Sequence, residues 1–251
     1  MGQLQNKTAV ITGGNSGIGY ATAADFLAKG AKVLITGRNP EAVQQAADTL
    51  GNDTDSFIAD QGKIADTQKL AEYVRDRYGK IDILFVNAGI ADFGPFSAVT
   101  EESFDRLMDI NLKGAFFTVQ YLLPLIKDGG TIILLSSINA LAGMPGGSIY
   151  NASKAGLNSL GRTLSRELAS RKIRVNVVNP GPVETPILQK AGIPEEAINK
   201  DEMAKKLPAG RIGQPEEIAK LVSFLASDEA SFITGAEYNI DGGFSVHPLI
   251  G

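Results

Sequence analysis

Residues 7–29 read KTAVITGGNSGIGYATAADFLAK, in which an apolar strand, a glycine-rich turn and a helix follow one another. We predict a buried strand over residues 7–12 and a helix over roughly residues 17–29. The glycines permit a tight turn and let backbone N–H groups approach a phosphate, to which the helix presents its positive N-terminus. The spacing, G-x3-G-x-G, differs from the G-x-G-x-x-G dinucleotide fingerprint. The stretch still predicts a dinucleotide site.

Further apolar runs alternate with helical periods along the rest of the chain. The predicted strands cover residues 32–36, 56–59, 82–86, 131–136, 173–179 and 236–240. This alternation predicts an α/β fold, a Rossmann-like doubly wound parallel sheet with helices on both faces. A length of 251 residues with 43% hydrophobic content suits a single domain over residues 1–251.

Composition excludes several functional classes. The chain has no cysteine, which excludes a disulfide framework, a thiolate metal site and a cysteine nucleophile. The one histidine, His247, excludes a histidine triad in the body of the chain, and we predict no metal site. A net charge of −4 lacks the basic footprint of a nucleic-acid-binding protein.

No apolar stretch approaches the roughly 18 residues of a membrane span, and residues 1–6, MGQLQN, lack the basic and apolar regions of a signal peptide. We therefore expect a soluble, cytoplasmic protein with no membrane partner.

Ser137, Tyr150 and Lys154 form the pattern S-x12-Y-x3-K. In a helix the tyrosine and lysine lie on the same face, one turn apart. Lowering a tyrosine pKa from about 10 to about 7 needs roughly 4 kcal/mol, and a cation about 4 Å away at an effective dielectric of about 20 supplies that amount. We expect Lys154 to make Tyr150 a general acid/base. An ordinary exposed helix pair is the alternative for Y-x3-K taken alone.

Ser137 follows an apolar run and is expected at the rim of the sheet, where it would hydrogen-bond a substrate oxygen. Ser136 is its rival, but neighbouring residues of a strand face opposite ways.

Six ordered motifs make the whole chain resemble a classical short-chain dehydrogenase/reductase. They are T-G-x3-G-I-G at 12–19, N-A-G at 87–89, Asn111, the Ser137/Tyr150/Lys154 set, P-G at 180–181 and D-G-G at 241–243. The resemblance implies Asn111, Ser137, Tyr150 and Lys154 as catalytic residues, with Asn111 holding a water that joins Lys154 to solvent. It also implies a homotetramer built through the long helices that follow the fourth and fifth strands.

The expected cofactor-binding residues follow the strand ends. They are Gly13, Asn15, Ser16, Gly17, Ile18, Gly19, Arg38, Asp60, Asn87, Ala88, Gly89, Tyr150, Lys154, Pro180, Gly181, Val183 and Thr185. By resemblance, Asp60 holds the adenine amino group, and the last four residues of the list, between positions 180 and 185, grip the nicotinamide carboxamide and the pyrophosphate. A plain helix cap is the alternative for Asp60. For Asn111, within a helix expected over residues 101–126, the alternative is a core or kink role.

Cofactor choice is predicted from the end of the second strand, which reads Thr36, Gly37, Arg38. An NAD site usually places an acid here, whereas Arg38 could pair with a 2′-phosphate. We predict NADP(H), with NAD(H) as the weaker alternative. The preference is expected to be moderate because Asn15 and Ser16 leave the glycine turn without a second basic residue. A mere surface charge is the alternative for Arg38.

The predicted reaction is reduction of a neutral, partly hydrophobic ketone or aldehyde by NADPH. The candidate pocket segments, residues 90–96, 138–144 and 187–188, are mainly apolar, with Asp92 and Asn139 as exceptions. Residues 185–213 are predicted to form a lid over the substrate, or else a surface excursion. The alternatives are a 3-oxoacyl-(acyl-carrier-protein) reductase, for which only Arg171 and Lys172 suggest a carrier-docking surface, and a non-catalytic NADP(H)-sensing protein. His247 and the apolar tail, residues 248–250, are expected at a subunit contact.

Overall fold

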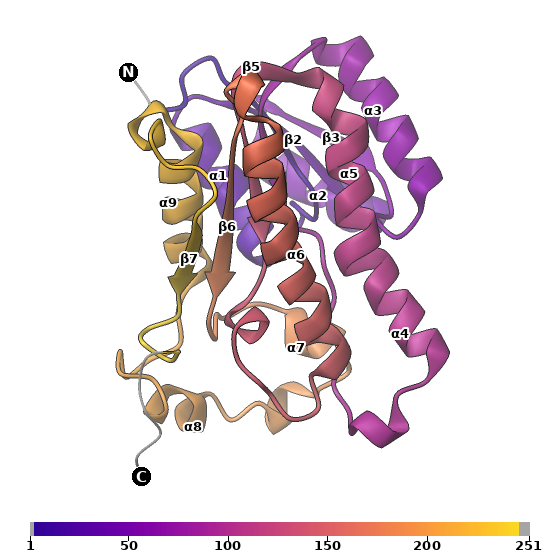
Figure 1. The fold of residues 1–251 in the computed structure, drawn as a ribbon, viewed down its shortest axis with the longest axis vertical. Coiled ribbons are helices and arrows are strands. Elements are labelled where there is room, and N and C mark those ends of the chain that lie inside the picture. The colour runs from indigo at the N-terminus through magenta and orange to yellow at the C-terminus, as the bar shows by residue number, and fades with distance from the viewer. Residues whose placement is uncertain (1–2, 246–251) are drawn as a thin grey trace.

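The computed structural model describes residues 3–245 and has a single parallel sheet at its centre (Figure 1). Within these residues the sheet has seven strands in the order β3-β2-β1-β4-β5-β6-β7. The strands are β1 (Thr8–Ile11), β2 (Lys32–Gly37), β3 (Thr54–Ile58), β4 (Ile81–Val86), β5 (Ile126–Leu135), β6 (Arg174–Pro180) and β7 (Glu237–Ile240). The order reverses between β1 and β4. The predicted doubly wound α/β fold is confirmed.

Helices cover both faces of the sheet, which explains why the strands are apolar on both sides. Helices α1 (Gly17–Ala28), α2 (Pro40–Leu50) and α9 (Pro215–Ala226) lie on one face, and α3 (Ile64–Tyr78), α5 (Ala115–Leu122) and α6 (Ser148–Glu167) on the other (Figure 1). Successive residues of β2 face opposite layers. Ile35 packs with Phe26 of α1 in the first, and Leu34 with Val74 of α3 in the second.

The helix predicted over residues 101–126 is confirmed as one helical stretch that ends at Leu125, but its hydrogen-bonding pattern changes along its length. Helix α4 (Glu101–Met108) passes into a π-helical turn, Asp109–Gly114, before α5, and a 3-10 turn, Leu123–Leu125, then leads into β5. At Gly114 an added Cβ would lie 2.1 Å from the Gln61 carbonyl oxygen, so the turn packs tightly against the segment after β3. The widened turn also contains Asn111, at a change of helical pattern that residue periodicity does not reveal.

Strand β5 begins at Ile126, five residues before its predicted start at 131. Ile126 pairs with Ile81 of β4, while the next paired position joins Thr131 to Ile83. An irregularity in register therefore absorbs the intervening residues, whose exposed, glycine-containing sequence conceals the first part of the strand.

The predicted lid, residues 185–213, forms short helices beyond the carboxyl ends of β6 and β7 (Figure 1). It contains α7 (Ile187–Lys190), a 3-10 turn (Glu195–Ala197) and α8 (Lys200–Lys205). The base is closed by a parallel bridge between Val183 and Gly213, in which Gly213 N–H donates to the Pro182 carbonyl at 3.0 Å. The two ends of the segment are thus fastened together at the sheet.

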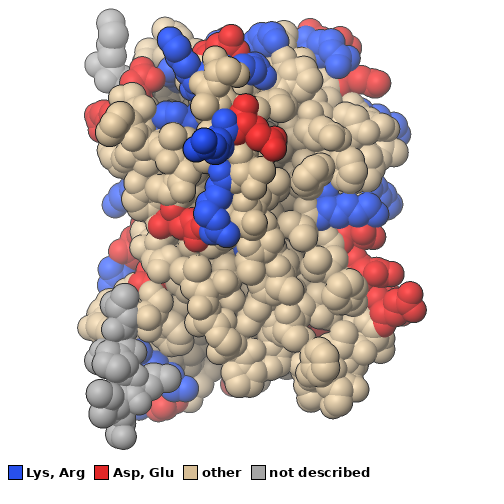
Figure 2. Space-filling view, viewed as in Figure 1, with Lys and Arg blue, Asp and Glu red and all other residues tan. Residues whose placement is uncertain are grey.

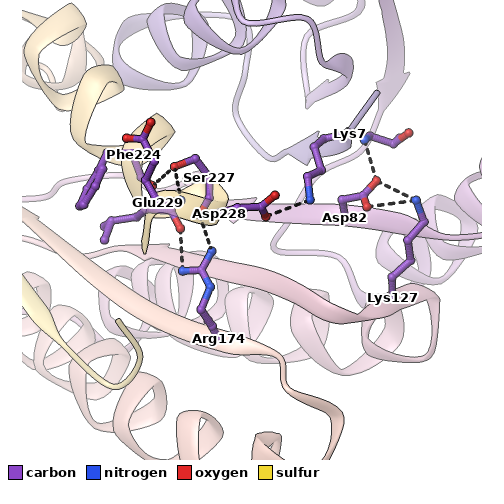
Figure 3. A network of polar contacts seen from close by, with 10 residues as sticks. Lys7, Asp82, Lys127, Arg174, Phe224, Ser227, Asp228 and Glu229 are labelled. Atoms are coloured by element: carbon purple, nitrogen blue, oxygen red, sulfur yellow. Dashed lines mark hydrogen bonds and ion pairs between the residues drawn. The ribbon is translucent and has the colours of Figure 1, made fainter. Parts of the chain in front are cut away.

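The amino end of the sheet is fastened by polar contacts between elements (Figure 3). Asp82 of β4 accepts a hydrogen bond from the Thr8 backbone at 2.9 Å and pairs with Lys127 at 2.9 Å. Arg174 donates to the carbonyl oxygens of Leu225 and Ser227 at 2.8 and 3.1 Å, which satisfies the C-terminal end of α9. Figure 3 also shows Lys7 bonded to Asp228.

None of the helices within residues 3–245 is both long enough and apolar enough to cross a membrane. His247 and the tail expected at a subunit contact lie outside the described residues.

Candidate active site

A cavity of about 580 Å³ opens at the carboxyl ends of β1, β2 and β4, next to the point where the strand order reverses. In doubly wound sheets this is where ligands bind. Eleven of the predicted cofactor residues line it: Gly13, Asn15, Ser16, Gly17, Ile18, Arg38, Asp60, Asn87, Ala88, Gly89 and Thr185.

The glycine turn has the backbone that its sequence predicts. Gly13 and Gly17 have φ angles of +65° and +53°, which residues with a side chain rarely adopt. Gly19 has a different task, because an added Cβ there would lie 2.4 Å from the Gly13 carbonyl oxygen. It lets α1 pack against the turn and does not contribute to the cavity wall.

Asn87 connects the turn to β4. Its side-chain amide donates to the carbonyl oxygens of Thr12 and Gly13 at 2.8 and 3.1 Å. The Thr12 hydroxyl accepts in return from the backbone N–H groups of Asn87 and Ala88, each at 3.0 Å. These reciprocal bonds hold the carboxyl ends of β1 and β4 in a fixed relation beneath the cavity.

Asp60 lines the cavity and accepts a hydrogen bond from Gly62 N–H at 3.0 Å. Helix α3 begins four residues after it, with Lys63 at the N-cap position, so the helix-cap alternative for Asp60 is wrong. One lone-pair region of the carboxylate holds the turn after β3, and the rest is available to a ligand in the cavity.

Ser137, Tyr150 and Lys154 meet where β5 ends against α6. All three are buried, with 8%, 8% and 4% of their surface exposed. The Lys154 ammonium lies 5.7 Å from the centre of the Tyr150 ring and donates to the Leu135 carbonyl at 2.9 Å. Ser136 faces the other way, with its hydroxyl donating to the Lys154 carbonyl at 2.9 Å. The alternation expected of a strand thus places Ser137, and not Ser136, beside the phenol.

In this structure the pKa of Tyr150 is not lowered, as the spacing of Tyr150 and Lys154 predicts, but raised. Burial raises the pKa of Tyr150, and a hydrogen bond from Ser137 offsets part of that rise. The Lys154 ammonium donates to the Leu135 carbonyl and not to the phenol oxygen. Burial also lowers the pKa of Lys154 to about 8. Tyr150 is therefore protonated at neutral pH, as a general acid must be.

Asn111 braces the same corner from the π-helical turn. Its amide oxygen accepts from Ile90 N–H at 2.8 Å, and its amide nitrogen donates to the Ile90 carbonyl at 2.9 Å and to the Ser153 hydroxyl at 3.2 Å. A Cβ added to Gly89 would lie 3.2 Å from the Asn111 amide oxygen and 3.5 Å from the Lys154 ammonium. Asn111 and Lys154 therefore flank one stretch of backbone without a direct hydrogen bond between these two described side chains.

Residues 180–185, at and after the end of β6, differ in position: some line the cavity and others contact the sheet. Thr185 lines the cavity. Pro180 ends β6, Gly181 N–H donates to the Ile240 carbonyl at 3.0 Å, and Val183 forms the bridge at the base of the lid. Of the four residues predicted here to contact the cofactor, only Thr185 lines the cavity, whereas Pro180 and Gly181 belong to or bond with the sheet and Val183 bridges to Gly213.

Among the cavity residues that sequence reasoning missed, Gln61 and Lys190 make notable polar contacts. Gln61 donates its amide to the carbonyl oxygens of Ala88 and Ile110, both at 2.9 Å, while its amide oxygen is buried without a partner at the cavity. Lys190 of α7 donates to the Ser16 hydroxyl at 2.8 Å. Gln61 follows Asp60 and could have been found from that neighbour, whereas no local signal marks Lys190.

The substrate side of the site is mainly apolar, as predicted. The Phe93 ring packs against Tyr150 with ring centroids 5.8 Å apart, and Ile90 and Ile187 line the adjoining cavity. The polar exception Asp92 is paired with Arg106 of α4 at 2.6 Å.

These features fit an elongated phosphate-bearing dinucleotide. The glycine turn supplies backbone N–H groups, Arg38 supplies a cation, and Asp60 and the unpartnered oxygen of Gln61 supply acceptors. Tyr150 and Lys154, also predicted to bind the cofactor, do not line the cavity in this structure, but Lys154 contacts the cavity residue Leu135. Among residues 3–245 no group of three or more His, Cys, Asp or Glu side chains is placed to hold a metal ion.

The chain is similar to several known oxidoreductases over nearly its whole length. A family model described as enoyl-(acyl carrier protein) reductase matches residues 13–245. The chain is 39% identical to the 3-oxoacyl-(acyl-carrier-protein) reductase FabG of Thermotoga maritima, covering 97% of this chain and 100% of that one. It is 36% identical to an NADP-dependent (R)-specific alcohol dehydrogenase of Lentilactobacillus kefiri, over 97% and 98% of the two chains. A short-chain dehydrogenase/reductase from Brucella melitensis, titled a glucose/ribitol dehydrogenase, has a similar structure, with a TM-score of 0.91 and 36% identity over 97% of this chain and 98% of that one.

Proposed function

The chain belongs to the short-chain dehydrogenase/reductase family of oxidoreductases, and from that membership we propose that it is an NADPH-dependent reductase of neutral, partly hydrophobic ketones or aldehydes. The observation that carries the proposal is the buried set of Ser137, Tyr150 and Lys154, which lies next to the cavity because Lys154 bonds to the cavity residue Leu135, while Arg38 lines the cavity itself.

The proposed chemistry divides between cofactor and protein. A nicotinamide dinucleotide, when bound, supplies the hydride. Tyr150 gives its proton to the carbonyl oxygen of the substrate, and its raised pKa keeps the phenol protonated at neutral pH, so that the proton is present to be given. Asn139 N–H donates to the Ser137 oxygen at 3.2 Å, and the Ser137 hydroxyl meets Tyr150 in this structure, so its proton would turn from the phenol to the same substrate oxygen when the substrate binds.

Lys154 contributes to the site through the three protons of its ammonium group. One of its protons is used by the Leu135 carbonyl, and the other two are available for the nicotinamide ribose that the family resemblance assigns to it. Asn111 fixes the backbone at Ile90, whose neighbour Gly89 lies close to the Lys154 ammonium. The water link between Asn111 and Lys154 remains a prediction.

NADP(H) is favoured over NAD(H) by the residues after β2. Arg38 lies at the cavity edge, directly after the last residue of the strand, where an acidic residue would contact a ribose hydroxyl in an NAD site. The printed description of the Lentilactobacillus kefiri relative as NADP-dependent supports this preference.

A second candidate is reduction of 3-oxoacyl groups on acyl carrier protein, which the name of the Thermotoga maritima relative favours. The surface expected to attract a carrier is weak. Arg171 pairs with Asp128 at 2.8 Å and donates to the Leu123 carbonyl at 2.9 Å, at the end of the sheet opposite the cavity. We therefore rank simple ketones first.

A substrate panel tests both proposals. Ketones, aldehydes and 3-oxoacyl thioesters are each assayed with NADPH and with NADH by absorbance of the reduced cofactor. We expect turnover of apolar ketones with NADPH exceeding that with NADH. Far greater activity on the thioesters would favour the second candidate. No turnover combined with tight NADPH binding would favour the cofactor-sensing alternative.

We also expect a homotetramer that pairs the long helices of one sheet face. Phe104 of α4 and Phe116 of α5 are each 44% exposed, and the lower part of the face that carries α6 has few charged side chains (Figure 2). Sedimentation equilibrium tests this assembly. The cytoplasmic location stays a prediction.

A further inference from the structure

Two cations from distant parts of the chain share one edge of the cavity. Arg38 follows β2, and Lys190 ends α7 in the lid, yet both line the same cavity. The Lys190 ammonium donates to the hydroxyl of Ser16 in the glycine turn at 2.8 Å. Within the described range, residues 3–245, neither cation forms an ion pair with a carboxylate.

Like charges held together without a counter-ion are unfavourable. The pKa of Lys190 is lowered, first by partial burial and then by the positive charge of Arg38, so the two groups are close enough to repel. A dianion between them would remove that repulsion and would accept charge-assisted hydrogen bonds from both. Ser16 and Asn15 supply further polar groups at the same edge.

We propose that Lys190 is the second cation of the adenosine 2′-phosphate site, so that the phosphate joins the lid to the glycine turn. This inference rests on the proposed NADP(H) preference. It supplies the basic group that the glycine turn lacks in its own sequence, because Lys190 comes from a position 174 residues away from Ser16. A phosphate bound to both Arg38 and Lys190 would hold α7 over the cavity.

The test uses two adenosine fragments that differ by the 2′-phosphate and require no turnover. Binding of 2′,5′-ADP and of 5′-AMP to the full chain is measured by titration calorimetry, for the wild type, Lys190→Met and Lys190→Gln. Both substitutions should weaken 2′,5′-ADP about tenfold, the loss expected for one charge-assisted hydrogen bond, and should leave 5′-AMP unchanged. The glutamine variant keeps a hydrogen-bond donor for Ser16, so a loss of 2′,5′-ADP affinity in that variant is due to the missing positive charge.

Lys206→Met is the matched control, because Lys206 caps α8 in the same lid and does not line the cavity. It should bind both fragments as the wild type does. The inference is overturned if the Lys190 variants lose nothing, or lose equally for both fragments. A wild type that binds the two fragments equally would instead refute the NADP(H) preference itself.

The coupling to the lid has its own measurement. Hydrogen exchange of residues 187–206 should slow when 2′,5′-ADP binds to the wild type, and 5′-AMP should slow it less. In Lys190→Met at saturating 2′,5′-ADP the additional protection should be lost. Equal protection in variant and wild type would show that the phosphate does not act on the lid through Lys190.

Discussion

The two ends of the sheet handle charge in opposite ways. At the amino end, Lys127 and Arg174 are satisfied by Asp82 and by helix carbonyl groups (Figure 3). At the carboxyl end, Lys154 is buried with a single carbonyl partner, and no carboxylate among residues 3–245 forms an ion pair with it. The comparison teaches that groups with complete partners hold the fold, whereas groups with spare hydrogen-bonding capacity remain available to ligands, at a cost in stability.

The largest effect is expected from removing the proton donor at the carboxyl end. Tyr150→Phe should lower turnover by roughly 10²–10⁴-fold, the usual contribution of general acid–base catalysis, because the ring remains while the proton is lost. The phenol has no ionic partner, so stability should change little. Steady-state kinetics with the best ketone of the panel and a urea melt measure the two effects. Near-full turnover with intact cofactor binding would refute the assignment.

Arg174→Met tests the amino end of the sheet, where we expect a loss of stability and little change in turnover. Helix carbonyl groups of Leu225 and Ser227 lose their donor, and we expect a loss of about 2–3 kcal/mol in the free energy of unfolding. Turnover per folded molecule should stay near that of the wild type, since the residue lies at the end opposite the cavity. Urea unfolding and active-site titration measure these quantities. A collapse of turnover in the folded variant would contradict the separation of the two ends.

Lys154 offers a pH-dependent test. Its pKa is lowered from 10.5 to about 8 in the folded protein, so the unfolded chain binds more protons between these values. The wild type should therefore gain up to roughly 3 kcal/mol relative to Lys154→Met as pH rises from 8 toward 10.5.

Urea unfolding of both proteins without cofactor, at a series of pH values, measures that difference. At pH 7 the Lys154→Met variant should be the more stable protein, although its turnover should be lost. Parallel stability curves would mean that burial does not disfavour the ammonium.

Asp82→Asn should have the smallest effect. The amide can still accept from Thr8 N–H, but the ion pair with the half-exposed Lys127 is lost. We expect a loss of about 0.5–1 kcal/mol that shrinks in high salt. Chemical denaturation at low and high ionic strength checks it. A loss independent of salt would assign the effect to the backbone contact.

The sequence by itself determined the features that local order encodes. The strand, turn and helix of residues 7–29 require only neighbouring residues, as does the one-turn spacing of Tyr150 and Lys154. Alternation of neighbouring residues predicted that Ser136 and Ser137 face opposite ways, and the family spacing to Tyr150 chose Ser137. Sequence reasoning therefore predicted the fold, the position of the cavity and the residues that meet beside it.

Tertiary structure alone decided the environment of those residues. The direction of the Tyr150 pKa shift depends first on how deeply the phenol is buried and then on its hydrogen bond with Ser137, and both are set by the packing of the chain. The contact between Lys190 and Ser16 spans 174 positions. Desolvation and long-range contacts are properties of the packed chain, so no window of sequence contains them.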